Sequence, residues 1–161
     1  MNAVDFHTGD DLRELYRELI LDHARNPRHF GKLDRPTHTA EGINPLCGDK
    51  LRLNVRVDDQ ENIADASFEG SGCAISVASA SLLTDMVIGL PVAQALDCFT
   101  VVTQRLTSPN VEREQDIGVD LSKIKALDGV REFPSRVKCA TLAWHALRSA
   151  IHGQTAPVST E

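Results

Sequence analysis

Apolar and polar residues alternate from residue 51 to residue 57, where the chain reads LRLNVRV. Every second residue of this segment is apolar, and arginine or asparagine stands between them. A period of two is typical of a β-strand with one face buried and the other in water. A second run of this kind, after a polar turn at residues 58–62, places three apolar residues on one face: Ala64, Ala66 and Phe68. The pattern predicts a hairpin or meander that ends in the glycine-rich residues 70–72.

Four other segments have the spacing or the boundaries of helices. Between residues 10 and 24, apolar residues recur three or four positions apart, Asp10 is a candidate N-terminal cap, and Asn26-Pro27 marks the end. Glycine or proline bounds each of the other three predicted helices, which cover residues 73–89, 91–106 and 138–152. Strands followed by helices predict an α+β fold.

The remaining segments carry weaker signals. Residues 107–136 are polar and acidic and contain only a short helical pattern, LSKIKAL. Residues 1–9 and the tail 153–161 are expected to be flexible. A chain of 161 residues is long enough for one hydrophobic core, so residues 1–161 are predicted to form a single domain.

Charge and hydropathy exclude several classes of protein. The chain has 17 basic and 23 acidic residues and a net charge of -6, so it lacks the basic surface that nucleic-acid binding needs. Polar residues interrupt every apolar run before it reaches the roughly 18 residues of a membrane span. The first residues have neither the basic nor the apolar part of a signal peptide, so we expect a cytoplasmic protein with reduced cysteines.

The four cysteines differ in their predicted surroundings. Cys47 lies in a Pro/Gly loop before a strand, and Cys73 and Cys139 lie at the predicted N-termini of helices. The free N–H groups and dipole at such termini favour a thiolate, which binds metals and attacks sulfur. Cys98 lies in the middle of a predicted helix and is interpreted as a small buried apolar residue. The alternative for the cysteines is a disulfide pair, which a reducing compartment disfavours. The six histidines are interpreted as packed or solvated side chains, not as metal ligands.

The stretch NPLCGD, residues 44–49, suggests how a metal site is formed. In an extended segment Cys47 and Asp49 point to the same side, while Gly48 removes the side chain that would crowd the bend. Three thiolates and one carboxylate form a tetrahedral set that zinc accepts. No CxxC pair is present, so the spacing of the cysteines is by itself a weak zinc signal.

Four blocks of sequence in a fixed order resemble the IscU/SufU family of iron–sulfur cluster assembly proteins. They are DHARNPRHFG (residues 22–31), NPLCGD (44–49), FEGSGCAIS (68–76) and RVKCATLAWHAL (136–147). The IscU branch has a histidine directly before its third cysteine, where this chain has Lys138. Residues 118–134 resemble the insertion that distinguishes the SufU branch. Both features favour the SufU branch.

The resemblance implies a small antiparallel sheet covered on one side by several helices. It also implies a zinc-dependent sulfur-transfer protein with the ligands Cys47, Asp49, Cys73 and Cys139. Cys47 would accept persulfide sulfur from a SufS-type cysteine desulfurase and pass it towards a downstream iron–sulfur scaffold. Whether such a protein counts as an enzyme, a zinc-dependent sulfurtransferase, is left open.

Two other functions remain possible at this point. One is a scaffold on which a transient iron–sulfur cluster is assembled by the same ligands. The other is a protein in which zinc has only a structural role. Structural zinc sites are usually closed by cysteine and histidine, so the aspartate ligand argues against the latter.

Overall fold

The computed structural model describes residues 9–108 and 116–160. Of the flexible start expected for residues 1–9, residues 1–8 lie outside this range and Gly9 begins a helix. Residues 109–115 of the polar segment also lie outside it. In chain order, the elements are α1 (Gly9–Arg25), β1 (His38–Asn44), β2 (Asp49–Val57), β3 (Ile63–Ser71), α2 (Ala74–Val87), α3 (Val92–Thr107), the 3-10 helix η1 (Ser122–Glu132), α4 (Pro134–Ile151) and β4 (Val158–Ser159).

The sheet has four strands in the order β3-β2-β1-β4. The predicted hairpin is confirmed as β2 and β3, which pair antiparallel. Strand β1 pairs antiparallel with β2 and was not predicted. Every second residue at its end is buried, as in a strand, but these buried residues are small or polar: Ala40, Gly42 and Asn44. The pattern of hydrophobic residues therefore could not reveal it.

The last strand changes the character of the sheet. Val158 and Ser159 pair parallel with Gly42 and Ile43 of β1, so the sheet is mixed and not wholly antiparallel. The backbone N–H of Thr160 donates to the carbonyl of Ile43, at 3.2 Å. Two residues of the tail thus lie at the edge of the sheet.

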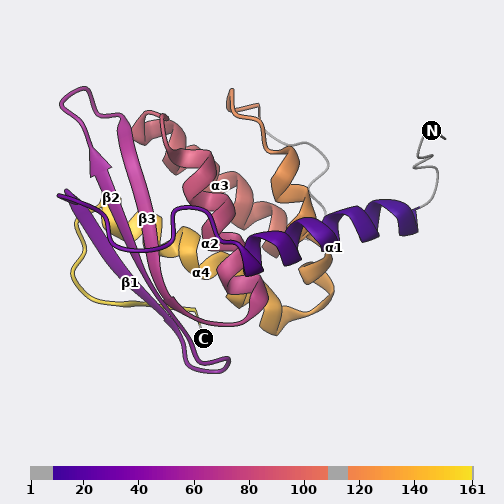
Figure 1. Ribbon diagram of the computed structural model, residues 1–161. Coiled ribbons are helices and arrows are strands. Elements are labelled where there is room, and N and C mark those ends of the chain that lie inside the picture. Colours follow the sequence, from indigo (N-terminus) through magenta and orange to yellow (C-terminus); the bar gives the residue numbers. More distant parts are fainter. Residues whose placement is uncertain (1–8, 109–115, 161) are drawn as a thin grey trace.

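The helices cover one face of the sheet, as Figure 1 shows, and the α+β prediction is confirmed. Helix α4 packs against β1 and β2, and α2 packs against β3, α1 and α4. The predicted helices at residues 10–24, 73–89 and 91–106 correspond to α1, α2 and α3. Helix α4 begins at Pro134, four residues before the predicted start, because proline at the first position of a helix suits its fixed φ.

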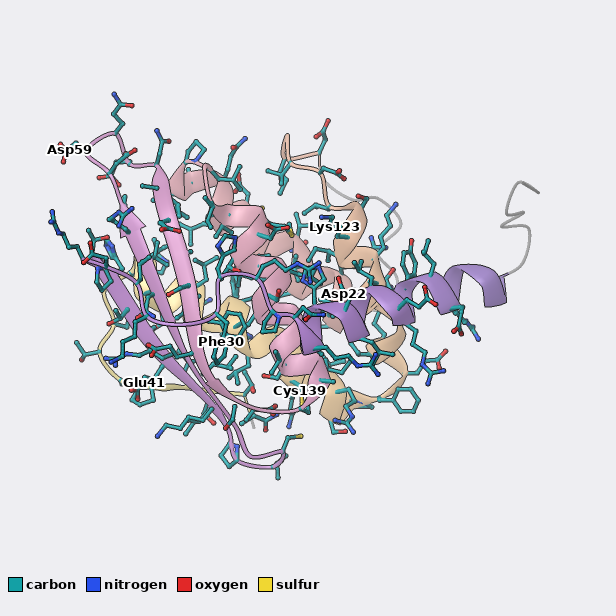
Figure 2. All side chains as sticks on the ribbon, in the orientation of Figure 1. Asp22, Phe30, Glu41, Asp59, Lys123 and Cys139 are labelled. Atoms are coloured by element: carbon teal, nitrogen blue, oxygen red, sulfur yellow. The ribbon has the colours of Figure 1, made fainter. Side chains whose placement is uncertain are left out.

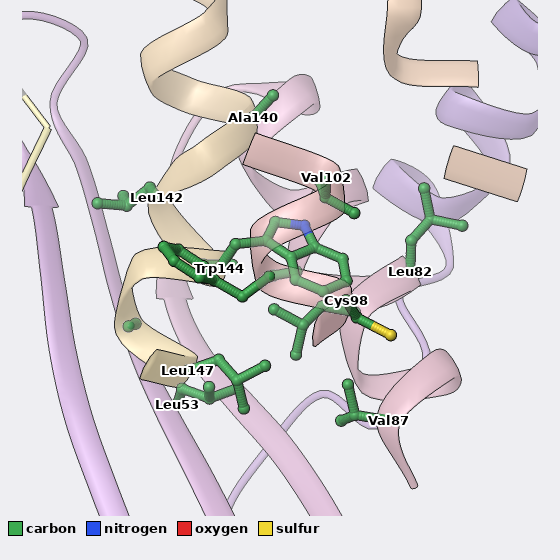
Figure 3. Close-up of a cluster of buried hydrophobic side chains, with 14 of the residues drawn as sticks. Leu53, Leu82, Val87, Cys98, Val102, Ala140, Leu142, Trp144 and Leu147 are labelled. Atoms are coloured by element: carbon green, nitrogen blue, oxygen red, sulfur yellow. The ribbon is translucent and has the colours of Figure 1, made fainter. Parts of the chain in front are cut away.

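Trp144 of α4 lies at the centre of the core (Figure 3). Its indole N–H donates to Ser79 Oγ at 3.2 Å, and Ser79 in turn donates to the carbonyl of Ala140 at 2.5 Å. The small residues of α2 allow this close approach of α2 and α4, and nine of its 14 residues are buried. The core thereby fixes the position of α4 relative to the sheet.

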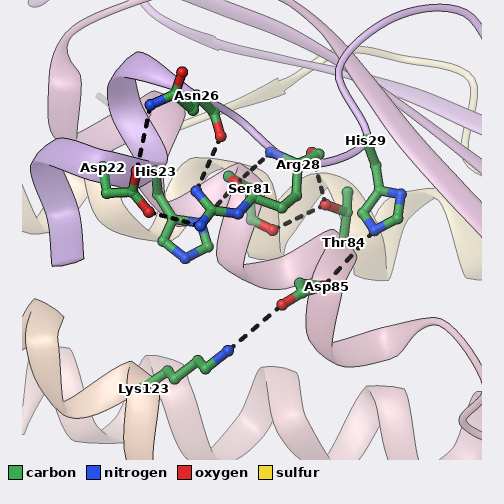
Figure 4. A network of polar contacts seen from close by, with 9 residues as sticks. All are labelled: Asp22, His23, Asn26, Arg28, His29, Ser81, Thr84, Asp85 and Lys123. Atoms are coloured by element: carbon green, nitrogen blue, oxygen red, sulfur yellow. Dashed lines mark hydrogen bonds and ion pairs between the residues drawn. The ribbon is translucent and has the colours of Figure 1, made fainter.

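The DHARNPRHFG block forms a polar junction between α1 and α2 (Figure 4). His23 is almost completely buried and its Nδ1 lies 2.7 Å from Ser81 Oγ, which also accepts the backbone N–H of Arg28. Arg28 pairs with Asp22 at 2.6 Å. Burial, together with the charge of Arg28, lowers the pKa of His23, so this ring stays neutral in the folded protein.

Within residues 9–108 and 116–160, no helix is both long and apolar enough to cross a bilayer.

Candidate metal centre

The predicted ligands meet at one end of the sheet. Cys47 lies in the turn of residues 45–48 between β1 and β2, and Asp49 is the first residue of β2. Cys73 directly precedes α2, and Cys139 lies on α4. Figure 2 shows Cys139 at the opposite end of the sheet from Asp59 in the β2–β3 turn. The site is thus built from four separate elements.

Three of the four side chains form a compact group. One ligand atom each from Cys47, Asp49 and Cys139 lie within 4.8 Å of one another. Cys73 is not part of this mutual group, but its Sγ lies 4.0 Å from Asp49 Oδ2. The structure therefore gathers Cys47, Asp49 and Cys139 and places Cys73 at the edge of the group.

Asp49 has one carboxylate oxygen fixed and the other directed to the sulfurs. The backbone N–H of Cys73 donates to Asp49 Oδ1 at 2.8 Å. Cys73 is the N-cap residue of α2 and has no side-chain capping bond of its own, so Asp49 satisfies this end of the helix. Asp49 is almost completely buried, and Oδ2 remains available to a metal.

Two glycines shape the site for different reasons. Gly48 has φ +72°, and an added Cβ would meet nothing within 4 Å. Glycine is therefore needed here because it adopts the left-handed conformation of the turn. The expectation that it removes a crowding side chain from an extended segment was wrong. At Gly72 an added Cβ would lie 2.6 Å from Asp49 Oδ1. Gly72 is therefore required so that the aspartate can cap α2.

Cys139 differs from its prediction in one respect. It is the sixth residue of α4, so the free N–H groups of the helix N-terminus do not reach it. Its Sγ lies 3.5 Å from the carbonyl of Ser135 and accepts an N–H from Asn44 Nδ2 at 3.6 Å. Burial raises the pKa of the Cys139 thiol well above its usual range, and hydrogen bonds to Asp49 and Cys47 raise it further. A metal ion bound at this sulfur would oppose the shift by favouring the thiolate.

Two polar residues at the site were not predicted. Arg136 lies three residues before Cys139 on α4, is exposed, and has its pKa raised by the neighbouring Cys73 and Cys139 sulfurs. Asn44 ends β1 beside the cysteine turn. Asn44 belongs to the NPLCGD block and Arg136 to the RVKCATLAWHAL block, so their nearness to the cysteines in sequence was the available signal.

The donor set and its surroundings fit a bound zinc ion. Soft sulfur atoms and one carboxylate are zinc ligands, and they converge from separate elements. In the described part of the chain, Asn44 Oδ1 and Ser76 Oγ are buried without a hydrogen-bond partner, and both residues adjoin this site. A bound cation would favour the thiolate form of the buried Cys139 and offset the burial of the Asp49 carboxylate.

A groove of about 880 Å³ opens beside the site between α1, η1 and the start of α4. Cys73 and Arg136 lie on its wall, so the groove is continuous with the metal centre. Its apolar surface includes Tyr16, Ile75 and the exposed Phe133. Two acidic residues line the groove, Asp128 and Glu132. Five basic residues line it as well: Arg13, Arg17, Lys125, Arg131 and Arg136. This groove is therefore basic in an acidic chain.

Cys98 lies away from the site, in accordance with its prediction. It is fully buried in α3. Burial, with a smaller contribution from Asp97, raises the pKa of its thiol to about 11. Its thiol is therefore an inert part of the core.

Fold and site together define a small α+β protein with a candidate cysteine and aspartate metal centre at one end of its sheet. The chain belongs to the family of NifU-like N-terminal domains, whose family model matches residues 15–156. The resemblance to iron–sulfur cluster assembly proteins of the SufU and IscU type is thereby confirmed.

Three relatives illustrate this similarity. The chain is 40% identical over 141 residues to the zinc-dependent sulfurtransferase SufU of Bacillus subtilis (strain 168), which covers 88% of this chain and 92% of that protein. It is 38% identical over 140 residues to the iron–sulfur cluster assembly scaffold protein IscU of Streptococcus pyogenes serotype M1, covering 87% and 84% respectively. A crystal structure from Fervidobacterium islandicum AW-1, described as a scaffold protein for iron–sulfur cluster assembly in the SUF system, superposes with a TM-score of 0.75 and 32% identity, covering 86% of this chain and 98% of that one.

Proposed function

We propose that this chain is a zinc-dependent sulfur-transfer protein of iron–sulfur cluster assembly. Cys47, Asp49, Cys73 and Cys139 hold one zinc ion, and Cys47 accepts persulfide sulfur from a SufS-type cysteine desulfurase. The observation that carries the proposal is the gathering of Cys47, Asp49 and Cys139 at an accessible end of the sheet. The similarity to a zinc-dependent sulfurtransferase supports it.

The proposed ligands have distinct tasks. Bound zinc supplies the positive charge that keeps the thiolates deprotonated near neutral pH. Cys139 is fully buried and held by α4, so it is suited to remain a ligand throughout. Cys47 is half-buried on a four-residue turn, where it has the access that a nucleophile needs. Asp49 joins the turn of Cys47 to the N-cap position of Cys73.

The proposed transfer is a thiol–disulfide exchange. The Cys47 thiolate attacks the terminal sulfur of the persulfide on the desulfurase cysteine. A sulfur–sulfur bond forms to Cys47 while the bond between that sulfur and the desulfurase cysteine breaks. The desulfurase cysteine leaves as a thiolate that carries the electron pair. One persulfide replaces another, so the step needs no external oxidant or reductant.

The basic groove supports an approach of the desulfurase from the side of α1 and η1. It reaches the metal centre at Cys73 and Arg136, so a partner held there lies beside the proposed ligands. The excess of basic side chains favours a partner with an acidic surface beside its active site. The segment of residues 118–134, which we infer to be the SufU-type insertion within a single domain, supplies Lys125 and Phe133 to this groove.

The sulfur recipient that fits this chemistry is a downstream iron–sulfur scaffold, and the reducing cytoplasm is the compartment in which free cysteines persist. All four cysteines are free in the structure.

A second candidate function is that of a scaffold for a transient iron–sulfur cluster. The similarity to an IscU scaffold protein favours it, and cysteine thiolates also ligate such clusters. Lys138 argues against it, because a protonated lysine cannot replace the histidine of the IscU branch. A purely structural zinc site is less favoured, because Cys47 lies on an accessible turn.

The proposal is tested by measuring metal content and desulfurase turnover on the same preparation. We expect one zinc per chain and a faster turnover of a SufS-type desulfurase on free cysteine when this protein is present. A protein purified without metal, equally stable, and without effect on turnover would refute the proposal.

A further inference from the structure

Asn44 contacts two of the proposed thiolate ligands and pairs across the sheet with the residue that supplies the carboxylate ligand. Its side-chain Nδ2–H donates to Cys139 Sγ at 3.6 Å. Its backbone carbonyl accepts the N–H of Cys47 at 3.2 Å. Across the sheet it is the register partner of Asp49. Asn44 therefore lies at the point where the cysteine turn, the aspartate and α4 meet.

The amide of Asn44 is kept there at an energetic cost. Its side chain is 1% exposed, and its Oδ1 has no hydrogen-bond partner in the described part of the chain. A buried carbonyl without a partner is destabilising, and an apolar residue of similar shape would avoid that cost. The amide does, however, form the hydrogen bond from its N–H to Cys139 Sγ. This points to a role at the sulfur, beyond packing.

A hydrogen bond to a metal-bound thiolate changes the chemistry of that sulfur. The N–H withdraws electron density from sulfur, so the thiolate becomes a weaker nucleophile and its lone pair is partly occupied. Cys139 is both fully buried and bonded to this amide, whereas Cys47 lies on an accessible turn. The two sulfurs thus differ in access and in hydrogen bonding, although both belong to one compact group.

We propose that Asn44 is a positioning residue that keeps Cys139 as the retained ligand and so directs incoming sulfur to Cys47. The role rests on the proposed function, because it concerns which of two thiolates receives the sulfur. Its backbone bond holds the turn of Cys47, and its side-chain bond suppresses the reaction of Cys139. A single residue thereby separates a reactive from an unreactive sulfur within one site.

The test compares the zinc-loaded wild-type protein with Asn44→Leu, which has a similar size and no N–H donor. Each protein is treated with iodoacetamide, a reaction in which the sulfur attacks carbon and iodide leaves. Peptide mass spectrometry then gives the ratio of alkylated Cys139 to alkylated Cys47. We expect this ratio to rise about tenfold in Asn44→Leu, the lower end of the effects seen when hydrogen bonds to metal ligands are removed.

A second readout uses cobalt(II) in place of zinc. Loss of the N–H bond raises the energy of the sulfur lone pair, so the sulfur-to-cobalt charge-transfer band should move to longer wavelength in Asn44→Leu. Asn54→Leu is the matched control, because Asn54 is also a buried asparagine of the sheet but bonds to Ser67 and Glu69. It should change neither the alkylation ratio nor the band.

An unchanged ratio and an unchanged band in Asn44→Leu would overturn the role of Asn44. If Asn44→Leu fails to bind metal, Asn44→Ala takes its place in both measurements. Loss of metal from both variants would also overturn the proposal, since Asn44 would then hold the site together and not distinguish its sulfurs. Neither readout involves sulfur transfer, so this result is independent of whether the wild-type protein activates a desulfurase.

Discussion

Replacing Gly72 with alanine should disturb the metal centre although Gly72 is not itself a proposed ligand. The added Cβ would lie 2.6 Å from Asp49 Oδ1 and 3.2 Å from Ser76 Oγ. Cβ atoms do not approach other heavy atoms within 3.0 Å, so the carboxylate must move away from the N-terminus of α2. The bond from the Cys73 N–H to Asp49 Oδ1, now 2.8 Å, would then break.

The magnitude follows from what that bond does. Loss of a capping bond at a helix N-terminus costs about 0.5–2 kcal/mol. A bond to a charged acceptor belongs in the upper part of that range, so we expect the free energy of unfolding to fall by about 1–2 kcal/mol. Because the same carboxylate is a proposed zinc ligand, its misplacement should weaken zinc binding about 10- to 100-fold, as for other groups that orient metal ligands.

Two measurements check this prediction. Zinc affinity is measured by competition with a chromophoric chelator, and stability by urea unfolding followed through the fluorescence of Trp144, the only tryptophan. Gly129→Ala is the matched control, because an added Cβ there would meet nothing within 4 Å and the backbone of Gly129 is not in the left-handed region. Wild-type zinc affinity in Gly72→Ala would refute the inference that the Asp49 cap orients a metal ligand.

Five further substitutions, two of them controls, probe the ligands, the polar junction and the groove. Asp49→Ala should still contain zinc, held by the three thiolates at lower affinity, but should lose most of its sulfur acceptance. Cys98→Ala should leave the zinc content unchanged. Elemental analysis and persulfide assays measure both outcomes. The pKa of His23 is lowered from 6.5 in the folded state, so the unfolded chain binds the proton first as the pH falls. Stability should therefore decline below about pH 6.5, by at most about 1.4 kcal/mol per pH unit, and His23→Gln should remove this part of the pH dependence. Arg17→Glu should raise the concentration of this protein that half-saturates the desulfurase about five- to tenfold at low salt, whereas Arg35→Glu, outside the groove, should not.

Each of these predictions has a distinct contrary result. Undiminished sulfur acceptance by Asp49→Ala would make the aspartate a bystander, and loss of zinc from Cys98→Ala would show that the wrong thiolates were chosen. A parallel decline of wild type and His23→Gln with falling pH would assign the acid sensitivity to other groups. Equal half-saturation by Arg17→Glu and Arg35→Glu would remove the groove from the docking surface.

Among the strands, those that could be predicted from the sequence have large apolar buried side chains. Strand β2 places Leu51, Leu53 and Val55 in the core at every second position, and its pattern was sufficient. Strand β1 buries Ala40 and Gly42 at the same period, but small residues give no hydrophobic signal. Gly42 is small because α4 crosses closely there, where an added Cβ would lie 3.0 Å from Leu142. Only the packed structure reveals that requirement.

The candidate site shows the same limit. The cysteines and the aspartate were predicted because their side chains carry the chemistry of metal binding. The cap that Asp49 provides joins residues 24 positions apart, and the bond from Asn44 to Cys139 joins residues 95 apart. Such contacts depend on the tertiary arrangement, so local patterns could not indicate them. The prediction that Cys139 lies at the N-terminus of its helix was wrong, because α4 begins at Pro134 and not at Lys138.

The most direct test of sulfur transfer is to locate the sulfur itself. The zinc-loaded protein is incubated with a SufS-type cysteine desulfurase, pyridoxal phosphate and cysteine, without iron, and the trapped persulfide is mapped by peptide mass spectrometry. The proposed function predicts that the additional sulfur is found on Cys47 and that Cys47→Ala abolishes it. Sulfur found mainly on Cys139, or no transfer without iron, would contradict it and favour the scaffold.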